Sequence, residues 1–107
     1  MIRLFKEKNA FLCTTISPAV PYALFDRSLT NATEVEQYNG NIVFDGIVEC
    51  ARAALANDIP VVLGNDVGCP WITQYDFWRE LCYFHKYTGV SNAFALYTAT
   101  KRSAELA

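Results

Sequence analysis

The residue best suited to chemistry is a single aspartate with a glycine on either side of it. Asp66 follows the apolar run Val61-Val62-Leu63 and stands between Gly64 and Gly68. The β-branched run after Pro60 is typical of a strand buried on both faces of a parallel sheet. At the end of such a strand a carboxylate can accept a proton when water attacks a carbonyl. Because α/β barrels carry catalytic groups at the carboxyl ends of their strands, Asp66 is our candidate catalytic residue.

A few other side chains near Asp66 can have either a functional or a purely structural role. Cys69 lies three residues further on, but no histidine or lysine stands beside it to activate the thiol. We therefore interpret Cys69 as a small buried residue. Trp71 and Tyr75 either line the mouth of a substrate site or pack the loop against the fold. His85, the only histidine, we interpret as a structural or surface residue.

Composition limits the classes of protein to consider. The chain has 107 residues, of which 52% are hydrophobic and 19% charged, so one short chain has little with which to cover its apolar surface. We expect it to self-associate or to be part of a larger fold. The net charge of -2 and the pI near 5.2 argue against nucleic-acid and membrane partners.

The four cysteines are widely spaced, without a C-x-x-C pair, and the sequence shows no signal peptide. We expect reduced thiols in a cytoplasmic protein.

The hydrophobic pattern predicts a strand, a long connection, a helix and a second strand. The first strand covers residues 11–16, and the connection covers residues 19–41 with a helical turn at 34–38. The helix covers residues 42–57, with Asn41 as its N-cap. Strand, crossover helix and strand at this spacing predict two parallel strands.

The segment after Asp66 is predicted to be helical. A helix over residues 75–87 carries the apolar residues at positions 77, 78, 81, 82, 84 and 87, and Gly89 ends it. Ser91 is a suitable N-cap for a further helical stretch. A last helix runs from Thr98 or Thr100 to the end of the chain, with Ala104 and Leu106 facing inward.

The residues around Asp66 resemble a known family. The run from Ile59 to Asp66 is similar to the strand-eight signature of the amidohydrolase superfamily, in its imidazolonepropionase and prolidase-like branch. Residues 79–81, 89–91, 95–100 and 103–106 follow that family's closing helices in order and spacing. The resemblance is clear from about residue 41 to 107, and residues 11–18 match strand seven.

This resemblance implies an α/β fold, namely a partial (β/α)8 barrel. The chain would be a single C-terminal fragment over residues 1–107, with strands seven and eight, their crossover helix and the C-terminal helices. It also implies a metal-dependent hydrolase that cleaves a C–N (amide-type) or related bond of a small-molecule substrate with metal-activated water. Asp66 would be a metal ligand or the proton acceptor, with zinc as the expected metal. Trp71 and Tyr75 would border the substrate mouth.

The sequence departs from the family in its metal ligands. The His-x-His pair, the Lys or Glu after strand four and the histidines after strands five and six are all missing. Asp58 replaces the usual glycine, and Asn65 replaces the usual hydroxyl residue. A catalytic zinc normally has three protein ligands, and Asp66 supplies one. We therefore expect the isolated chain to be inactive and to bind no metal.

An alternative from a different class stays open. The chain would then be a non-catalytic truncated fragment that folds only through self-association, since two strands leave two edges exposed. Its partner would be either further copies of itself, in a homo-oligomer, or the missing barrel portion.

Overall fold

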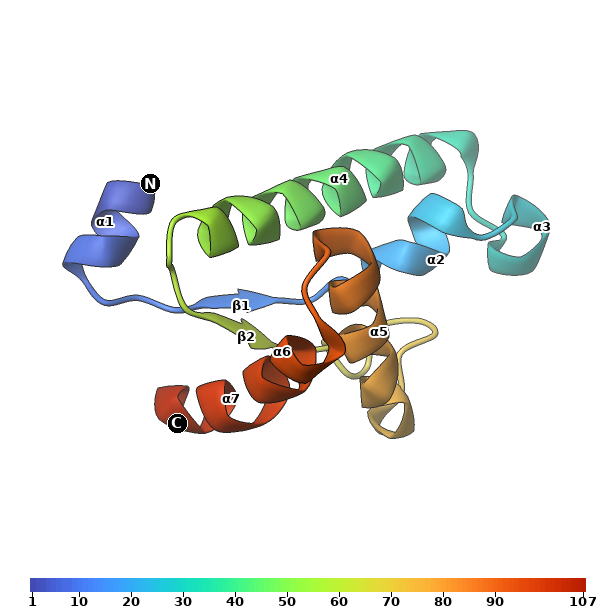
Figure 1. Cartoon of the computed structure of the whole chain (residues 1–107). Coiled ribbons are helices and arrows are strands. Elements are labelled where there is room, and N and C mark those ends of the chain that lie inside the picture. Colours follow the sequence, from blue (N-terminus) through green and yellow to red (C-terminus); the bar gives the residue numbers. More distant parts are fainter.

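A computed structural model describes all 107 residues as a helix-rich fold around a two-stranded parallel sheet (Figure 1). The elements in chain order are α1 (Ile2–Glu7), β1 (Leu12–Thr14), α2 (Ala19–Leu24), α3 (Arg27–Thr30), α4 (Glu34–Ala56), β2 (Val61–Leu63), the 3₁₀ turn η1 (Gln74–Asp76), α5 (Phe77–Thr88), α6 (Asn92–Tyr97), the π-helical turn η2 (Thr98–Arg102) and α7 (Ser103–Leu106). In Figure 1, α4 lies on one side of the two strands, and α6 and α7 lie on the other. None of these helices combines the length and the hydropathy that crossing a bilayer requires.

The predicted strand–helix–strand unit is confirmed. β1 and β2 run parallel, with Leu12 opposite Val61 and Thr14 opposite Leu63. The first strand ends earlier than predicted, because the amides of Ile16 and Ser17 bond to a side chain and not to a neighbouring strand.

The crossover helix α4 begins eight residues before the predicted start, so the prediction of Asn41 as N-cap was wrong. Thr33 is the N-cap: its hydroxyl accepts a hydrogen bond from the amide of Glu36, whose carboxylate accepts one from the amide of Thr33. This is a capping box. Asn41 lies inside the helix and donates to the carbonyl of Gln37. The predicted stop is confirmed, with Asn57 as C-cap.

The segment predicted as a long connection contains two short helices as well as the start of α4. Helix α2 carries Pro21 in its first turn, where a missing N–H costs nothing. It packs along α4 at Gly40, where an added Cβ would lie 2.7 Å from the Cβ of Tyr22 and 3.0 Å from its carbonyl carbon. Gly40 therefore allows the two helices to approach closely.

The C-terminal helices follow the predicted order with one error of orientation. Gly89 ends α5 in a left-handed conformation, and the hydroxyl of Ser91 accepts a hydrogen bond from the amide of Phe94, as predicted. Ala104 and Leu106 are exposed, however, and not inward. The π-helical turn η2 precedes them, and its wider spacing rotates the apolar face of the following residues away from the core.

One buried hydrophobic cluster holds the elements together, and a buried carboxylate lies among its members. The cluster combines residues of α2, α4, β2, α5 and α6. Glu80 on α5 is fully buried beside it. The Oε1 atom of Glu80 accepts a hydrogen bond from the amide of Ile16 at 2.7 Å; its Oε2 accepts one from the amide of Ser17 at 2.7 Å and one from the Ser17 hydroxyl at 2.5 Å. These bonds tie α5 to the segment that follows β1.

Two glycines of α4 provide a matched test of the contact between α2 and α4. Gly40→Ala should lower the free energy of unfolding by about 1–3 kcal/mol, because the new methyl group overlaps Tyr22. Gly46→Ala should raise it by about 0.5–1 kcal/mol, because an added Cβ meets nothing within 4 Å and alanine favours the helix. Urea unfolding at one protein concentration measures both. Equal effects of the two substitutions would contradict the close approach at Gly40.

Candidate functional site

Asp66 lies at the predicted position, just beyond the carboxyl end of β2. Its side chain is exposed and its backbone is left-handed, with φ of 51°. The parallel pairing with β1 brings Thr15 to the same edge of the sheet. Here the strand ends and the helices α2 and α4 enclose an open hollow of about 410 Å³, whose polar lining residues are Thr15, Tyr22, Glu36, Asn39 and Asp66. The position is as predicted, and the catalytic role stays a prediction.

The thiol of Cys69 is the nearest polar partner of Asp66. Its Sγ donates a hydrogen bond to Oδ2 of Asp66 over 3.0 Å. This bond raises the pKa of Cys69, with smaller contributions from burial and from the charge of Asp66. Cys69 is partly exposed, so the prediction of a buried residue was wrong; the loop holds it on the surface beside the carboxylate. A raised thiol pKa leaves little thiolate, which is the opposite of what a nucleophile needs.

The residues of this chain do not form a metal site by themselves. No group of three or more His, Cys, Asp or Glu side chains lies close enough together to hold a metal ion. The second carboxylate of the hollow, Glu36, is held by the amide and the hydroxyl of Thr33, each at 2.8 Å. That leaves Asp66, whose partner is a protonated thiol. A zinc centre needs more ligands than this edge of the sheet offers.

The two aromatic residues predicted at the substrate mouth are both on the surface. Trp71 is 55% exposed and lines a smaller hollow of about 100 Å³, together with Ser17, Asn65 and Arg79. Tyr75 is 82% exposed in the turn η1. They follow Asp66 in the same loop, and their contact with a substrate stays a prediction.

The remaining candidate, His85, is exposed on α5. Its Nδ1 lies 2.6 Å from the carbonyl oxygen of Val90, just beyond the end of the helix. This agrees with the interpretation of His85 as a structural or surface residue.

Sequence reasoning missed the role of Glu80. Burial raises the pKa of this carboxyl, and the hydrogen bonds from Ser17 and Ile16 oppose that rise. The signal was present, since Glu80 lies three residues after Phe77 and four before Phe84, on the buried face of α5. An acid in that stripe needs a polar partner in the core.

Comparison with known proteins gave one informative likeness. No family model matches the sequence, and no curated protein matches it. The structure is similar to the crystal structure of a putative prolidase from Bifidobacterium longum, with a TM-score of 0.86 and 33% sequence identity over 91% of this chain. The match is wider than residues 41–107. The chain spans 24% of the length of that protein. It therefore shares its fold with a piece of a prolidase-like protein, in agreement with the resemblance to amidohydrolases.

The bond between Asp66 and Cys69 can be tested through the reactivity of the thiol. Asp66→Asn removes the carboxylate that raises the pKa of Cys69, so the thiolate should form at lower pH. We expect iodoacetamide to alkylate Cys69 faster in the variant at mildly alkaline pH, as measured by mass spectrometry of its peptide. The rates at the exposed Cys50 and Cys82 serve as internal controls. An unchanged rate at Cys69 would argue against the bond.

The buried carboxyl of Glu80 predicts a pH dependence of stability. Because its pKa is raised in the folded chain, the folded state binds the proton more tightly than the unfolded state does. The contribution of Glu80 to the free energy of unfolding should therefore be greatest below its ordinary pKa and should decrease as the pH rises through the raised value. The measured quantity is the free energy of unfolding of the wild type in urea minus that of Glu80→Gln, followed from about pH 4 to about pH 8. We expect this value to fall as the pH rises. A difference that grows with pH would contradict the direction of the shift. Glu49→Gln, at an exposed position on α4 without an ion pair, controls for loss of a surface charge.

Proposed function

We propose that this chain supplies the Asp66-bearing part of a hydrolase that cleaves a C–N bond of a small-molecule substrate. One observation carries the proposal: an exposed aspartate stands at the carboxyl end of β2 in a chain that matches a quarter of a putative prolidase. On this proposal β1 and β2 are the last two strands of a (β/α)8 barrel, with the C-terminal helices closing it. The other strands would come from polypeptide outside these 107 residues.

The surroundings of Asp66 suit a group that is positively charged or that gives up a proton. The hollow is lined by the carboxylates of Asp66 and Glu36, without a Lys, Arg or His side chain. Because Glu36 is already bound to Thr33, Asp66 is the carboxylate available to a ligand. A carboxylate placed in this way can accept a proton from water that attacks a carbonyl.

A complete enzyme of this kind would use one or two divalent metals, zinc being our proposal. The ligands other than Asp66 would have to come from outside this chain, because the residues present do not form a metal site. It follows that the isolated chain should lack hydrolase activity.

A chimaera tests the proposal. The quarter of the Bifidobacterium protein that matches this chain is replaced by the chain, and hydrolysis of a dipeptide ending in proline is measured with divalent metal present. We expect the chimaera to fold and to retain activity. Asp66→Asn in the chimaera should lower the rate by about 10²–10⁴-fold, as is usual when a positioned acid or base is lost.

Asp58→Asn is the matched control. Asp58 and Asp66 are both exposed, both adopt positive φ (56° and 51°), and they stand at opposite ends of β2. The control should leave the rate unchanged, because Asp58 lies at the amino end. A chimaera that is folded but inactive, or one in which both substitutions have the same effect, would contradict the proposed role of Asp66.

A further inference from the structure

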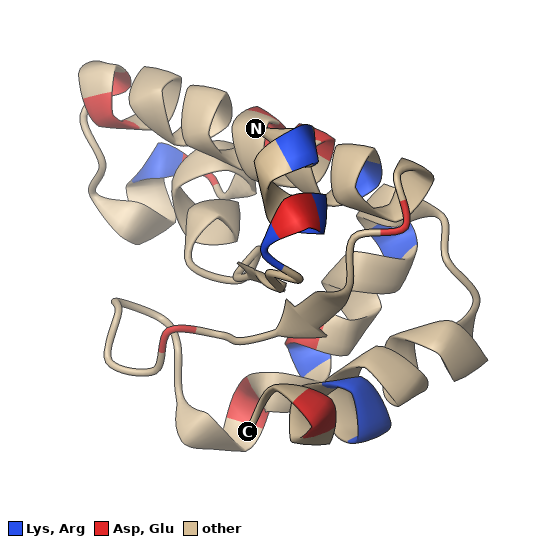
Figure 2. Cartoon of the chain, turned by 90° about the vertical axis from the view of Figure 1, so that its left-hand side faces the viewer, with Lys and Arg blue, Asp and Glu red and all other residues tan.

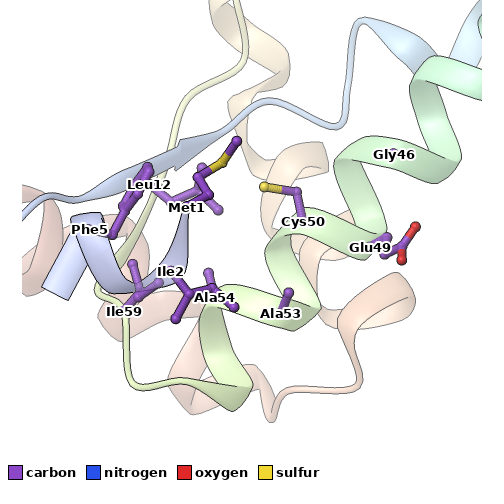
Figure 3. A pocket seen from close by; sticks show the side chains of 10 residues that line it. All are labelled: Met1, Ile2, Phe5, Leu12, Gly46, Glu49, Cys50, Ala53, Ala54 and Ile59. Carbon is purple, nitrogen blue, oxygen red and sulfur yellow. The ribbon is translucent and has the colours of Figure 1, made fainter.

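The hollow at the amino ends of the strands, between α1 and α4, is almost entirely apolar. It measures about 340 Å³, and Figure 3 shows its one charged side chain, Glu49, pointing away from the other lining side chains. Figure 2, which faces α1, shows basic and acidic segments interspersed on this side of the molecule. This hollow therefore has neither the converging polar groups nor the single-sign charge that would orient a ligand.

The smaller hollow that Trp71 lines has the mixed lining of a ligand site. It measures about 100 Å³ and is named here the Trp71 hollow. Its walls come from α2, the ends of both strands, the loop between β2 and α5, and α5 itself. Apolar and polar side chains alternate in its lining, among them Phe25, Ile72, Asn65, Asp76 and Arg79. Asp66 is not among its lining residues, so this hollow is distinct from the one at the proposed catalytic aspartate.

Asn65 is a buried residue of this hollow whose amide oxygen has no partner. The residue is 8% exposed, and its one side-chain hydrogen bond is long, 3.5 Å from Nδ2 to the carbonyl oxygen of Thr73. Polar atoms of buried side chains are nearly always hydrogen-bonded. The unpartnered atoms sealed from solvent are the hydroxyls of Thr14 and Thr98, so Oδ1 of Asn65 is not sealed. A hydrogen-bond donor inside the Trp71 hollow can therefore reach this oxygen.

Two side chains of opposite charge, Asp76 and Arg79, line the same hollow and keep bonding capacity. The Nε atom of Arg79 lies 3.3 Å from Oδ1 of Asp76, and both side chains are partly exposed. The two Nη groups of Arg79 have no hydrogen bond within the chain. Asp76 accepts one further bond, from the hydroxyl of Thr73, and its carboxylate has lone pairs left. The pair can thus bind an anionic and a cationic group side by side.

We propose that the Trp71 hollow binds a small free amino acid with an apolar side chain. The carboxylate of the amino acid bonds to the Nη groups of Arg79, whose guanidinium fork matches a carboxylate. Its ammonium group bonds to the carboxylate of Asp76 and to Oδ1 of Asn65. Its side chain packs against the rings of Phe25 and Trp71.

The charges and the volume of the hollow both favour such a zwitterion. A ligand with a single charge would be attracted by one of Asp76 and Arg79 and repelled by the other, whereas a zwitterion matches both. A closed cavity of about 150 Å³ is enough for a benzene molecule. The Trp71 hollow, at about 100 Å³ and open at its rim, therefore suits a side chain of the size of valine, with the charged groups at the rim.

Binding of L-valine to the chain tests the proposal. In Trp78→Phe, Trp71 is the one remaining tryptophan and reports on the hollow by its fluorescence. We expect a saturable change with a dissociation constant of about 0.1–10 mM, as fits a ligand of few atoms. L-valinamide lacks the carboxylate and 3-methylbutanoate lacks the ammonium group, so each should bind about tenfold or more weakly. Calorimetric titration of the wild type with L-valine should give the same dissociation constant.

A pair of arginine variants identifies the site. Arg79→Met should weaken the binding of L-valine about tenfold or more, because it removes the partner of the carboxylate. Arg3→Met is the matched control and should leave the affinity unchanged: Arg3 forms an ion pair over the same 3.3 Å, on α1, and does not line the hollow. Circular dichroism verifies that both variants fold.

Three outcomes would overturn the proposal. They are the absence of saturable binding of L-valine up to about 50 mM, equal binding of L-valine and its two analogues, and equal affinity of Arg79→Met and Arg3→Met. The experiment measures binding and not hydrolysis, so the chimaera can fail while the amino acid binds.

Discussion

The arrangement of this chain depends on one buried carboxylate. Two backbone amides at the carboxyl end of β1 have no strand to bond to, and Glu80 accepts from both of them and from the hydroxyl of Ser17. Burial of the carboxylate is costly, as its raised pKa shows, but three donors offset part of that cost. The interaction fixes the corner where β1 turns into α2, since the carbonyls of Ile16 and Ser17 accept from the first amides of that helix. It also fixes where α5 begins relative to the sheet.

The position of Asp66 follows from that constraint. The loop that carries it is held at one end by β2, which pairs with β1, and at the other by α5, which Glu80 ties to the segment after β1. Within this short span, Asp66, Gly68 and Trp71 all adopt positive φ, which is uncommon for a bulky residue such as tryptophan. The backbone conformation of this loop is therefore set more by β2 and α5 on either side than by the intrinsic conformational preferences of its residues. The aspartate lies on the surface at the strand end, and Trp71 lines the same small hollow as Ser17.

The parts that sequence reasoning predicted are those with strong local signals. The apolar run before Gly64 gave β2, and Gly89 and Ser91 gave the boundary between α5 and α6. Some of the errors arose where a distant contact decides the structure. Helix α2 contains Pro21 and is stabilised by packing on α4, so local breakers concealed it. The start of α4 is different, because the capping box at Thr33 is a local signal and Asn41 was nevertheless predicted as the N-cap. The burial of Glu80 could be predicted from its place on α5, but its partners could not, because they lie more than sixty residues away.

Two hollows of this chain lie at opposite ends of its two-stranded sheet. Asp66 stands at the carboxyl ends of the strands, whereas Leu12 and Ile59 place the hollow between α1 and α4 at their amino ends. In α/β barrels the carboxyl face carries activity and the amino face serves stability. The chain buries 20 of its 107 residues, a small core for its surface, which is what the proposed function expects of one part of a larger barrel.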